Sequence, residues 1–544
     1  MCSAVTGRRM SDTFAYLKMF AQFPFAARRF LAYTLTHAQA QDIVRDRMAH
    51  RAENFLHIVE HSIYAYPNSP YAQLLHHAGY TLADLRTLVE TKGLEEALRT
   101  LHDAGVYVTF EEFKGRKPIV RDGLTLDVKP SDFDNPHARR AFALTTGGST
   151  GLANAVYHDF DHIAAGAPHQ LLMLNAWNLV DVPMLAWLQI LPGGGIRFLL
   201  QRAAVRQYAQ AWYSSLGWRD SATWVKYAAA TVYMTLWMQL LGGRIPFPKI
   251  VRQKDALVIA RWMRETITKT GHCLLYCNVS HALRVCVAAQ ENGLDLTGAT
   301  IRIGGEPITP VKVAQIERVG ARVMPAYGAI DTGAIGLGCA DSEHIGDEHL
   351  LHDAYALITT PYHVQGINVT VPAFNLTSLL DTSPKLMLNY QIDDYGIVEE
   401  RQCRCALGAM GYTTHLREIR SYSKSVGEGV TLIGNELQQI LDQVLPARFG
   451  GSSLDYQWME QEDAQGITRL NLIISPRLEI TDESEVVRVV LNAMRTSSPT
   501  ADSARTVWQQ VNTIQVKRME PVLTARGKLL PLHIERNPKN QGTK

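Results

Sequence analysis

A short run rich in glycine and hydroxyl side chains constrains the fold of this chain more than any other feature of its sequence. Residues 145–151 read TTGGSTG, and the apolar stretch 141–144 just before them predicts a strand. Glycine lets backbone N–H groups face a ligand without a Cβ in the way, and successive N–H groups with hydroxyl donors form a concave anion site. A strand that leads into such a loop predicts an α/β protein with a phosphate-binding turn.

Two other interpretations of the same run stay open. Residues 147–151 satisfy the G-x-S-x-G pattern, in which Ser149 would be the nucleophile of a serine hydrolase. That pattern requires a helix directly after the serine, whereas residues 155–158 (AVYH) look extended. An ordinary glycine-rich turn is the second alternative. A Walker A loop is excluded because no Gly-Lys-Ser/Thr follows the glycines.

Composition excludes several classes of function. The chain has 544 residues, which is enough for more than one domain, and a net charge of +2, which gives no signal for a nucleic-acid partner. The longest uncharged central run, 227–242, is too short and too polar to span a membrane and predicts a buried helix. Seven cysteines and no recognisable signal peptide lead us to expect a cytoplasmic protein.

A strand–helix–strand unit follows in the second half of the chain. Residues 299–303 predict a strand, the helix begins at Pro310 and ends at Gly320, and 322–324 predict the second strand. Such a unit implies parallel strands, whose carboxyl ends bind ligands in open α/β sheets. The loops at 304–307 (GGEP) and 327–331 (YGAID) lie at those ends, so we expect them to converge with the glycine-rich run.

The character of the sequence changes past residue 424. Helices are predicted at 436–444 and 485–494, and strands around 467–474 and 514–516. These elements make a small α+β unit that ends in the segment 524–528 (TARGK). We therefore expect a large domain over residues 1–421 and a small one over 422–544.

Six segments, taken in order, resemble the motifs of the adenylate-forming superfamily, in the branch of the phenylacetate-CoA ligases and their capsule-locus relatives. The segments are 145–151 (phosphate loop), 305–307 (the loop beside the adenine), 327–331 (Y-G-x-T-E), 390–394 (Y-x-T-G-D), the hinge around Arg420, and 524–528 (T-x-x-G-K). The resemblance spans roughly residues 50–535. It implies an α/β fold in which a large adenylate-forming domain with mixed and parallel sheets carries a small mobile α+β domain.

The resemblance also implies an activity and its site residues. The activity is ATP-dependent conversion of a carboxylic acid to an acyl-adenylate with release of pyrophosphate, then thioester formation with CoA or with the phosphopantetheine thiol of an acyl or peptidyl carrier protein. Lys528 and Asp331 would be catalytic, and Asp331 would hold Mg²⁺. Nucleotide contacts would come from Thr145, Thr146, Gly147, Gly148, Ser149, Thr150, Gly151, Gly305, Glu306, Pro307, Tyr327, Gly328, Ala329, Ile330, Asp394 and Arg420. A monomer and a homodimer are both open.

Departures from the family pattern make a degenerate, non-ligating nucleotide module an alternative. Ile330 lacks the hydroxyl of the usual threonine, and Asp331 is one methylene shorter than the usual glutamate. Asp393 replaces the glycine before the ribose-binding aspartate, and Pro531 stands where an arginine is expected.

The acid itself is expected to be aromatic or otherwise apolar. Tryptophans are concentrated in residues 160–245, and Asn278 and His281 lie in a predicted pocket loop. Large aromatic side chains also fill cores, so this inference depends on where they lie.

Some relatives in this branch carry a structural zinc on a Cys/His/Cys/Cys set, and Cys339, His349, Cys403 and Cys405 match those places. A closed set of three thiolates and one imidazole suits tetrahedral Zn²⁺. His344 and His352 are alternative fourth ligands, and buried free thiols are the alternative to a metal site. Cys273 and Cys277, four residues apart on a predicted helix, are expected in the core.

Overall fold

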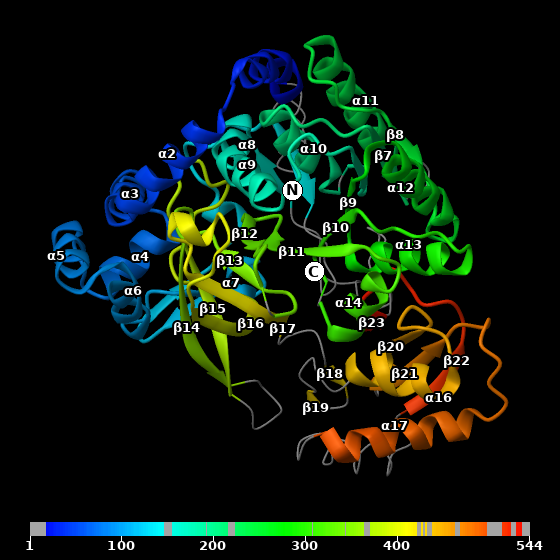
Figure 1. Cartoon of the computed structure of the whole chain (residues 1–544). Coiled ribbons are helices and arrows are strands. Elements are labelled where there is room, and N and C mark those ends of the chain that lie inside the picture. Colours follow the sequence, from blue (N-terminus) through cyan, green and yellow to red (C-terminus); the bar gives the residue numbers. More distant parts are fainter. Residues whose placement is uncertain are drawn as a thin grey trace, which may run out of the picture.

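The computed structural model describes residues 18–145, 155–191, 193–215, 224–306, 308–342, 344–363, 370–421, 426–427, 430–431, 438–462, 468–497, 514–523 and 529–535. A large mixed sheet with helices on both faces is followed by a small α+β unit with its own sheet (Figure 1). This confirms the expected fold class. Among the described helices, none combines the length and apolar character needed to cross a membrane.

One large sheet organises the first 421 residues. Its strand order is β14 (Tyr355–His363), β15 (Thr370–Ser378), β16 (Tyr390–Glu400), β17 (Thr414–Ser421), β13 (Glu348–Leu350), β12 (Gly333–Gly338), β11 (Arg322–Ala329), β10 (Ala299–Gly304), β9 (Cys273–Cys277), β6 (Met184–Trp187), β7 (Ala211–Ser214) and β8 (Pro248–Ile250). The strands from β11 to β8 pair in parallel, and those from β14 to β11 pair antiparallel. β1 (Val108–Thr109) pairs in parallel with β16.

Helices cover both faces of this sheet (Figure 1). Residues 18–32 are helical. The named helices are α2 (His37–Ala49), α3 (Arg51–Ile58), η1 (Val59–Tyr64), α4 (Pro70–His77), α5 (Leu82–Lys92), α6 (Leu94–Asp103), α7 (Phe110–Phe113), η2 (Pro130–Phe133), α8 (Phe160–Ala165), α9 (Ala167–Ala176), α10 (Gly195–Ala204), α11 (Trp224–Leu240), η3 (Gln253–Asp255), α12 (Leu257–Thr270), α13 (Val279–Glu291), α14 (Pro310–Glu317) and η4 (Gly408–Met410). Short hairpins are formed by β2 (Ile119–Arg121) with β3 (Leu124–Leu126), β4 (Phe142–Thr145) with β5 (Ala155–His158), and β18 (Val426–Gly427) with β19 (Val430–Thr431).

The predicted strand–helix–strand unit is present as β10, α14 and β11. Its strands pair in parallel, with Gly304 opposite Ala326. A Cβ on Gly304 would lie 2.3 Å from the Ala326 carbonyl oxygen, so only glycine fits this close approach. The carboxyl ends of β10 and β11 therefore lie side by side, as the sequence predicts.

One local expectation is wrong, and another holds in part. Cys273–Cys277 is the central strand β9, not a helix, and alternate side chains such as Leu274 and Leu275 enter different core clusters. A strand covered on both faces has a continuous apolar run, which a helix can also have. The run 227–242 lies in helix α11 up to Leu240. Met234 and Met238 of this helix are buried in the main core, whereas Leu236 and Leu240 are exposed.

The C-terminal unit has a four-stranded sheet in the order β22 (Ile514–Arg518), β21 (Thr468–Ile474), β20 (Tyr456–Glu462) and β23 (Leu532–Glu535). It is covered by η5 (Ile440–Val444), α16 (Leu445–Phe449) and α17 (Glu483–Ser497), so the helix expected at 436–444 extends to Phe449. The unit touches the large one at Thr309 Oγ1, which donates to Asp442 Oδ2 at 3.0 Å. The boundary at 421/422 stays a prediction.

Candidate functional site

The loops that follow β10 and β11 meet the acidic segment of β16. Tyr327 at the end of β11 donates its hydroxyl to Asp394 Oδ2 at 2.8 Å. Burial raises the pKa of Tyr390, and the carboxylates of Asp331, Asp393 and Asp394 raise it further. One phenol therefore lies within electrostatic range of all three carboxylates. Asp331 and Asp394, 63 positions apart in the sequence, therefore both lie near Tyr390.

Asp331 is buried in the turn between β11 and β12 and pairs with a lysine from another part of the chain. Lys114, just after α7, donates its ammonium to Asp331 Oδ2, and both side chains are almost completely buried. The other carboxylate oxygen, Oδ1, has no hydrogen-bond partner within the described residues. Lys114 also lies 5.7 Å from the Phe113 ring centroid, and that ring stacks on Tyr390 at 4.0 Å. An oxygen left unsatisfied beside an aromatic wall is suited to a cation.

The loop after β10 connects to the C-terminal unit. Glu306 Oε2 accepts from the backbone N–H of Ser280 at 3.1 Å and from the Ser280 hydroxyl. Ser280 Oγ in turn accepts from the backbone N–H of Leu529 at 3.2 Å. Leu529 follows Lys528 directly and packs in the core cluster that includes β9, α12 and α13. The backbone immediately after Lys528 is thus anchored at the loop that contains Glu306.

The other predicted nucleotide residues are placed as follows. Thr145 ends β4, and Arg420 lies near the end of β17, opposite Tyr395 of β16. Nε of Arg420 is buried without a partner among the described residues. Gly305 has a φ of +76°, which favours glycine. Thr146, Gly147, Gly148, Ser149, Thr150, Gly151, Pro307 and Lys528 lie outside the described residues.

The residues at the departures from the motif pattern, and their neighbours, make local contacts. Ile330 packs partly buried against the main core. Thr332, two residues on, accepts at Oγ1 from the Ala329 backbone N–H at 3.1 Å. A Cβ on Gly328 would lie 2.1 Å from the Gly333 carbonyl oxygen, so this turn requires glycine. Asp393 accepts at Oδ2 from the Ser421 hydroxyl at 2.7 Å.

Several residues of the site carry no motif that the sequence could reveal. Lys114 and Ser280 are described above, and Arg197 of α10 donates Nη1–H to the Ala329 carbonyl at 3.2 Å. His158 and His162 are buried beside Arg197, and burial, with help from the Arg197 charge, lowers the pKa of His162 to about 3. These histidines are therefore neutral near pH 7.

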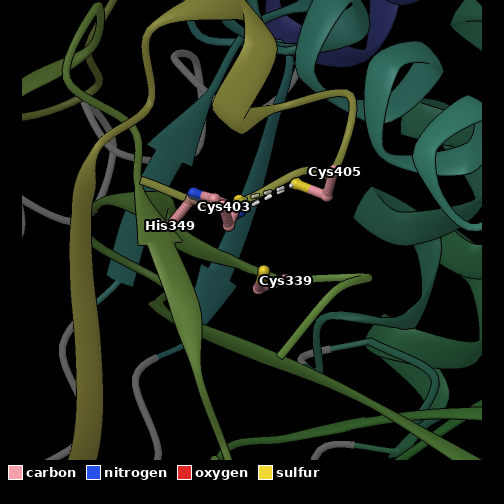
Figure 2. A group of neighbouring side chains, drawn as sticks. All are labelled: Cys339, His349, Cys403 and Cys405. Atoms are coloured by element: carbon pink, nitrogen blue, oxygen red, sulfur yellow. Dashed lines mark hydrogen bonds between the residues drawn. The ribbon is translucent and has the colours of Figure 1, made fainter. Parts of the chain in front are cut away.

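The predicted metal ligands form one compact group (Figure 2). The ligand atoms of Cys339, His349, Cys403 and Cys405 all lie within 4.8 Å of one another. His349 Nε2 is 3.1 Å from Cys405 Sγ, and Cys403 Sγ is 3.4 Å from Cys405 Sγ. Three sulfurs and one imidazole nitrogen, mostly buried, form a donor set that suits tetrahedral Zn²⁺.

The surroundings of this group orient its ligands. His349 donates Nδ1–H to the Tyr412 carbonyl at 2.8 Å, which leaves Nε2 facing the sulfurs. Hydrogen bonding to Cys339, with a further contribution from His349, lowers the pKa of Cys405 to about 3. A Cβ on Gly408 would lie 2.5 Å from Cys403 Sγ. The structure thus brings His349 into the group, and neither His344 nor His352 belongs to it.

The aromatic residues expected around the acid lie mainly in the core. Trp187 and Trp212 are fully buried, and their indole N–H groups donate to the Val251 and Leu188 carbonyls. His281 lies in helix α13, not in a loop, and stacks on Trp187 at 4.3 Å. Burial lowers the pKa of His281 to about 3, so this ring is a neutral core residue.

The segment after the glycine-rich run bears on the hydrolase alternative. β5 follows the run and pairs antiparallel with β4, with Ala155 opposite Thr145. A nucleophile elbow requires a strand–turn–helix arrangement. The β4–β5 hairpin therefore does not provide the scaffold that a Ser149 nucleophile would need.

Comparison with known proteins supports the fold. No family model matches the chain, and no curated protein matches it. A solved structure of 2-hydroxyisobutyryl-CoA ligase in the postadenylation state, in complex with R3-HIB-AMP, is similar to this chain with a TM-score of 0.51. The identity is 15%, and the match covers 92% of this chain and 90% of the ligase.

Two further enzymes match less well. ATP-bound MatB from Rhodopseudomonas palustris is 10% identical, with a TM-score of 0.41 and coverage of 89% of this chain and 91% of MatB. The amide bond synthetase McbA from Marinactinospora thermotolerans is 11% identical, with a TM-score of 0.40 and coverage of 93% and 98%. The chain has the fold of the adenylate-forming enzymes, as the order of its motifs predicts.

Proposed function

We propose that this protein activates a carboxylic acid with ATP. A carboxylate oxygen attacks the α-phosphorus, and the bond from the α-phosphorus to the oxygen that bridges to the β-phosphate breaks. Pyrophosphate departs, and the acyl-adenylate remains. The observation that carries the proposal is the parallel pairing of β10 with β11. The loop after β10 holds the Ser280–Glu306 contact, to which the residue after Lys528 is tied, and the end of β11 holds the Tyr327–Asp394 pair and leads to Asp331. Adenylation brings two anions together, so its site needs cations and N–H donors where charge develops.

The residues divide this work among themselves. The 145–151 loop would bind the departing pyrophosphate through its N–H and hydroxyl donors. Asp394 would accept from the ribose hydroxyls, with Arg420 as a second contact. Asp331 would hold Mg²⁺ through the unpartnered Oδ1, and the ion would draw charge from the phosphates.

Lys528 would bridge the carboxylate and the α-phosphate in the first step. Substitution Lys528→Ala is expected to abolish acid-dependent pyrophosphate release and to spare thioester formation from supplied acyl-adenylate. A control at the exposed Lys117 is expected to change neither rate. Loss of both half-reactions in a folded K528A variant would contradict this division of roles.

The second step would transfer the acyl group to a thiol. The sulfur attacks the acyl carbon and AMP leaves, which gives a thioester of CoA or of a carrier-protein phosphopantetheine. By its name, 2-hydroxyisobutyryl-CoA ligase makes such a CoA thioester. We extend this acceptor class to the present chain, which makes it an AMP-forming acid–thiol ligase similar to the phenylacetate-CoA ligases, with an acid whose body is aromatic or apolar.

We also assign a structural zinc to Cys339, His349, Cys403 and Cys405. Their mutual distances and the orientation of His349 support this assignment. The metal would tie β13 to the loop after β16 and takes no part in the reaction. Metal analysis of protein purified without chelator is expected to give one zinc per chain, and no bound zinc would favour free thiols.

ATP–pyrophosphate exchange with a panel of acids tests the main proposal. Acid-dependent exchange supports acid activation and identifies the acid. ATP binding without exchange for any acid would favour a degenerate nucleotide module. Labelling of Ser149 by a fluorophosphonate in the absence of ATP would instead favour a hydrolase.

A further inference from the structure

Two buried arginines lie close to the proposed site without a carboxylate partner. Arg202 of α10 is 1% exposed and Arg302 of β10 is 8% exposed. Among the ion pairs of the described residues, none involves either guanidinium group. Nε and Nη1 of Arg202 and Nε of Arg302 have no hydrogen-bond partner there. An isolated buried charge is costly unless it is paired, so two of them indicate a missing anion.

Both guanidinium groups lie against the same aromatic wall. The centre of the Tyr276 ring is 5.8 Å from the Arg202 guanidinium carbon and 5.0 Å from that of Arg302. Phe198, on α10, lies 5.1 Å from Arg302 and packs edge-on against Tyr276. Aromatic faces stabilise cations, but two like charges at one ring repel each other. An anion between them would remove that repulsion.

Glu348, the carboxyl group whose charge acts on Arg302, does not supply this anion. Glu348 lies within electrostatic range of Arg302, but burial raises the pKa of Glu348 to about 8. Its carboxyl group is therefore mostly protonated at pH 7. Asp181, the acidic group within range of Arg202, lies on an exposed turn. The cluster of Arg202, Arg302, Phe198 and Tyr276, which we call the arginine cluster, thus keeps a net positive charge.

The arginine cluster is next to the catalytic loops along two elements. Arg302 lies two residues before Gly304, where β10 enters the loop with Glu306. Arg197, five residues before Arg202 on α10, bonds to the Ala329 carbonyl beside Asp331. Strand β10 and helix α10 therefore each connect the arginine cluster to one of the two loops of the proposed site.

We propose that the acid activated by this protein is a dicarboxylic acid with an apolar or aromatic body, and that Arg202 and Arg302 bind its far carboxylate. The near carboxylate would reach the α-phosphate beside Asp331, and the body would pack against the aromatic pair that Phe198 and Tyr276 form. This inference rests on the proposed acid activation. Arginine suits the role because its planar fork binds a carboxylate through two parallel hydrogen bonds.

Matched pairs of acids test the proposal: adipate against hexanoate, and terephthalate against benzoate. The natural chain is expected to show a kcat/KM for pyrophosphate release at least about 100-fold higher for the better diacid than for its monoacid partner, because a missing anion leaves two guanidinium groups unpaired. In Arg202→Met the diacid value is expected to fall about 100-fold, while the monoacid value stays within about threefold. Arg261→Met, on the exposed face of α12, is the matched control and should change neither value.

Stability separates a ligand-binding arginine from a structural one. Without ligand, Arg202→Met is expected to keep or raise Tm, because it removes an unpaired buried charge. If that variant does not fold, Arg202→Lys and Arg302→Lys keep the charge and lose the fork, and each should lower the diacid value alone by about tenfold. Equal rates for diacids and monoacids in the natural chain, or an equal loss of both in the variants, would overturn the inference and leave acid activation intact.

Binding without ATP keeps the two proposals distinguishable. If no acid supports exchange, acid activation fails, but the arginine cluster can still be tested by Tm. Millimolar adipate or terephthalate is then expected to raise the Tm of the natural chain and of Arg261→Met, and not that of Arg202→Met. Absence of this shift would overturn the anion site itself.

Discussion

Two buried polar centres of this protein, the Cys/His group and Asp331, differ in how many of their polar atoms have a partner within the described residues. In the Cys/His group every ligand atom faces the others, and the remaining nitrogen of His349 is bonded to the Tyr412 carbonyl. At Asp331 one oxygen is paired with Lys114 and the other has no partner among the described residues. A centre that closes on itself stabilises a fold, whereas a half-satisfied one is where a ligand enters. We propose that the first centre is structural and that the second binds the cation of the nucleotide.

The largest effect, on zinc content and Tm, is expected when the Cys/His group is disrupted. Cys405→Ser removes the sulfur that lies nearest to His349 and should lower zinc content to near zero. Structural zinc contributes many kcal/mol, so Tm is expected to fall by about 5–10 °C. Metal analysis and thermal unfolding measure both changes. Cys286→Ser, a buried cysteine away from the group, is the control and should retain zinc. Full stability of C405S without metal would contradict a structural role.

A substitution at Asp331, the half-satisfied centre, should lower the activity and leave the zinc content unchanged. Asp331→Asn is expected to lower kcat/KM for pyrophosphate release about 100- to 1,000-fold, because a charge that stabilises the transition state is lost. Zinc content should stay at one per chain. Asp331→Glu keeps the charge and should retain most of the activity. If Asp331→Asn lowers zinc content as strongly as activity, the two centres are not independent.

Substitution of Lys114 tests whether Asp331 binds a cation as well as Lys114. In Lys114→Met the buried carboxylate loses its only described partner, which costs about 3 kcal/mol and lowers the Tm of the nucleotide-free protein. Mg²⁺ with ATP should restore more of the lost Tm in this variant than it adds to the natural chain, because the cation then pairs with Asp331. Lys117→Met, exposed three residues away, should behave as the natural chain. An equal gain in both proteins would show that Lys114 and the cation do not share Asp331.

The same contrast explains what the sequence could predict. The β10–α14–β11 unit follows local rules, because Pro310 and Gly320 mark a helix between two apolar runs. The Cys-x-Cys spacing is also local, so two members of the metal group stand out at once. His349 could not be told apart from His344 or His352 by spacing, since the choice depends on pairing between β12 and β13.

Contacts between residues far apart in the chain could not be predicted from the sequence. Lys114 and Asp331 are 217 positions apart, and Lys114 has the surroundings of an ordinary helix end. Arg202 and Arg302 belong to no motif, and only burial reveals them. The apolar run Cys273–Cys277 predicts a helix although it is a strand, because strands buried on both faces lose the alternation that identifies them. The roles assigned to the 145–151 loop and to Lys528 stay predictions.

The smallest effect is expected at the Tyr327–Asp394 pair. Tyr327→Phe removes the hydroxyl that donates to Asp394 Oδ2 and leaves the ring in place. A hydrogen bond to a charged group contributes about 1.5 kcal/mol, so KM for ATP should rise about tenfold. Because ribose is bound equally in the ground and transition states, kcat should change little. Steady-state kinetics with ATP as the varied substrate measures both constants. The exposed Tyr66→Phe is the control. A fall in kcat with an unchanged KM would place Asp394 in the chemical step rather than in ribose binding, and Asp331 and Asp394 would then act as one catalytic unit.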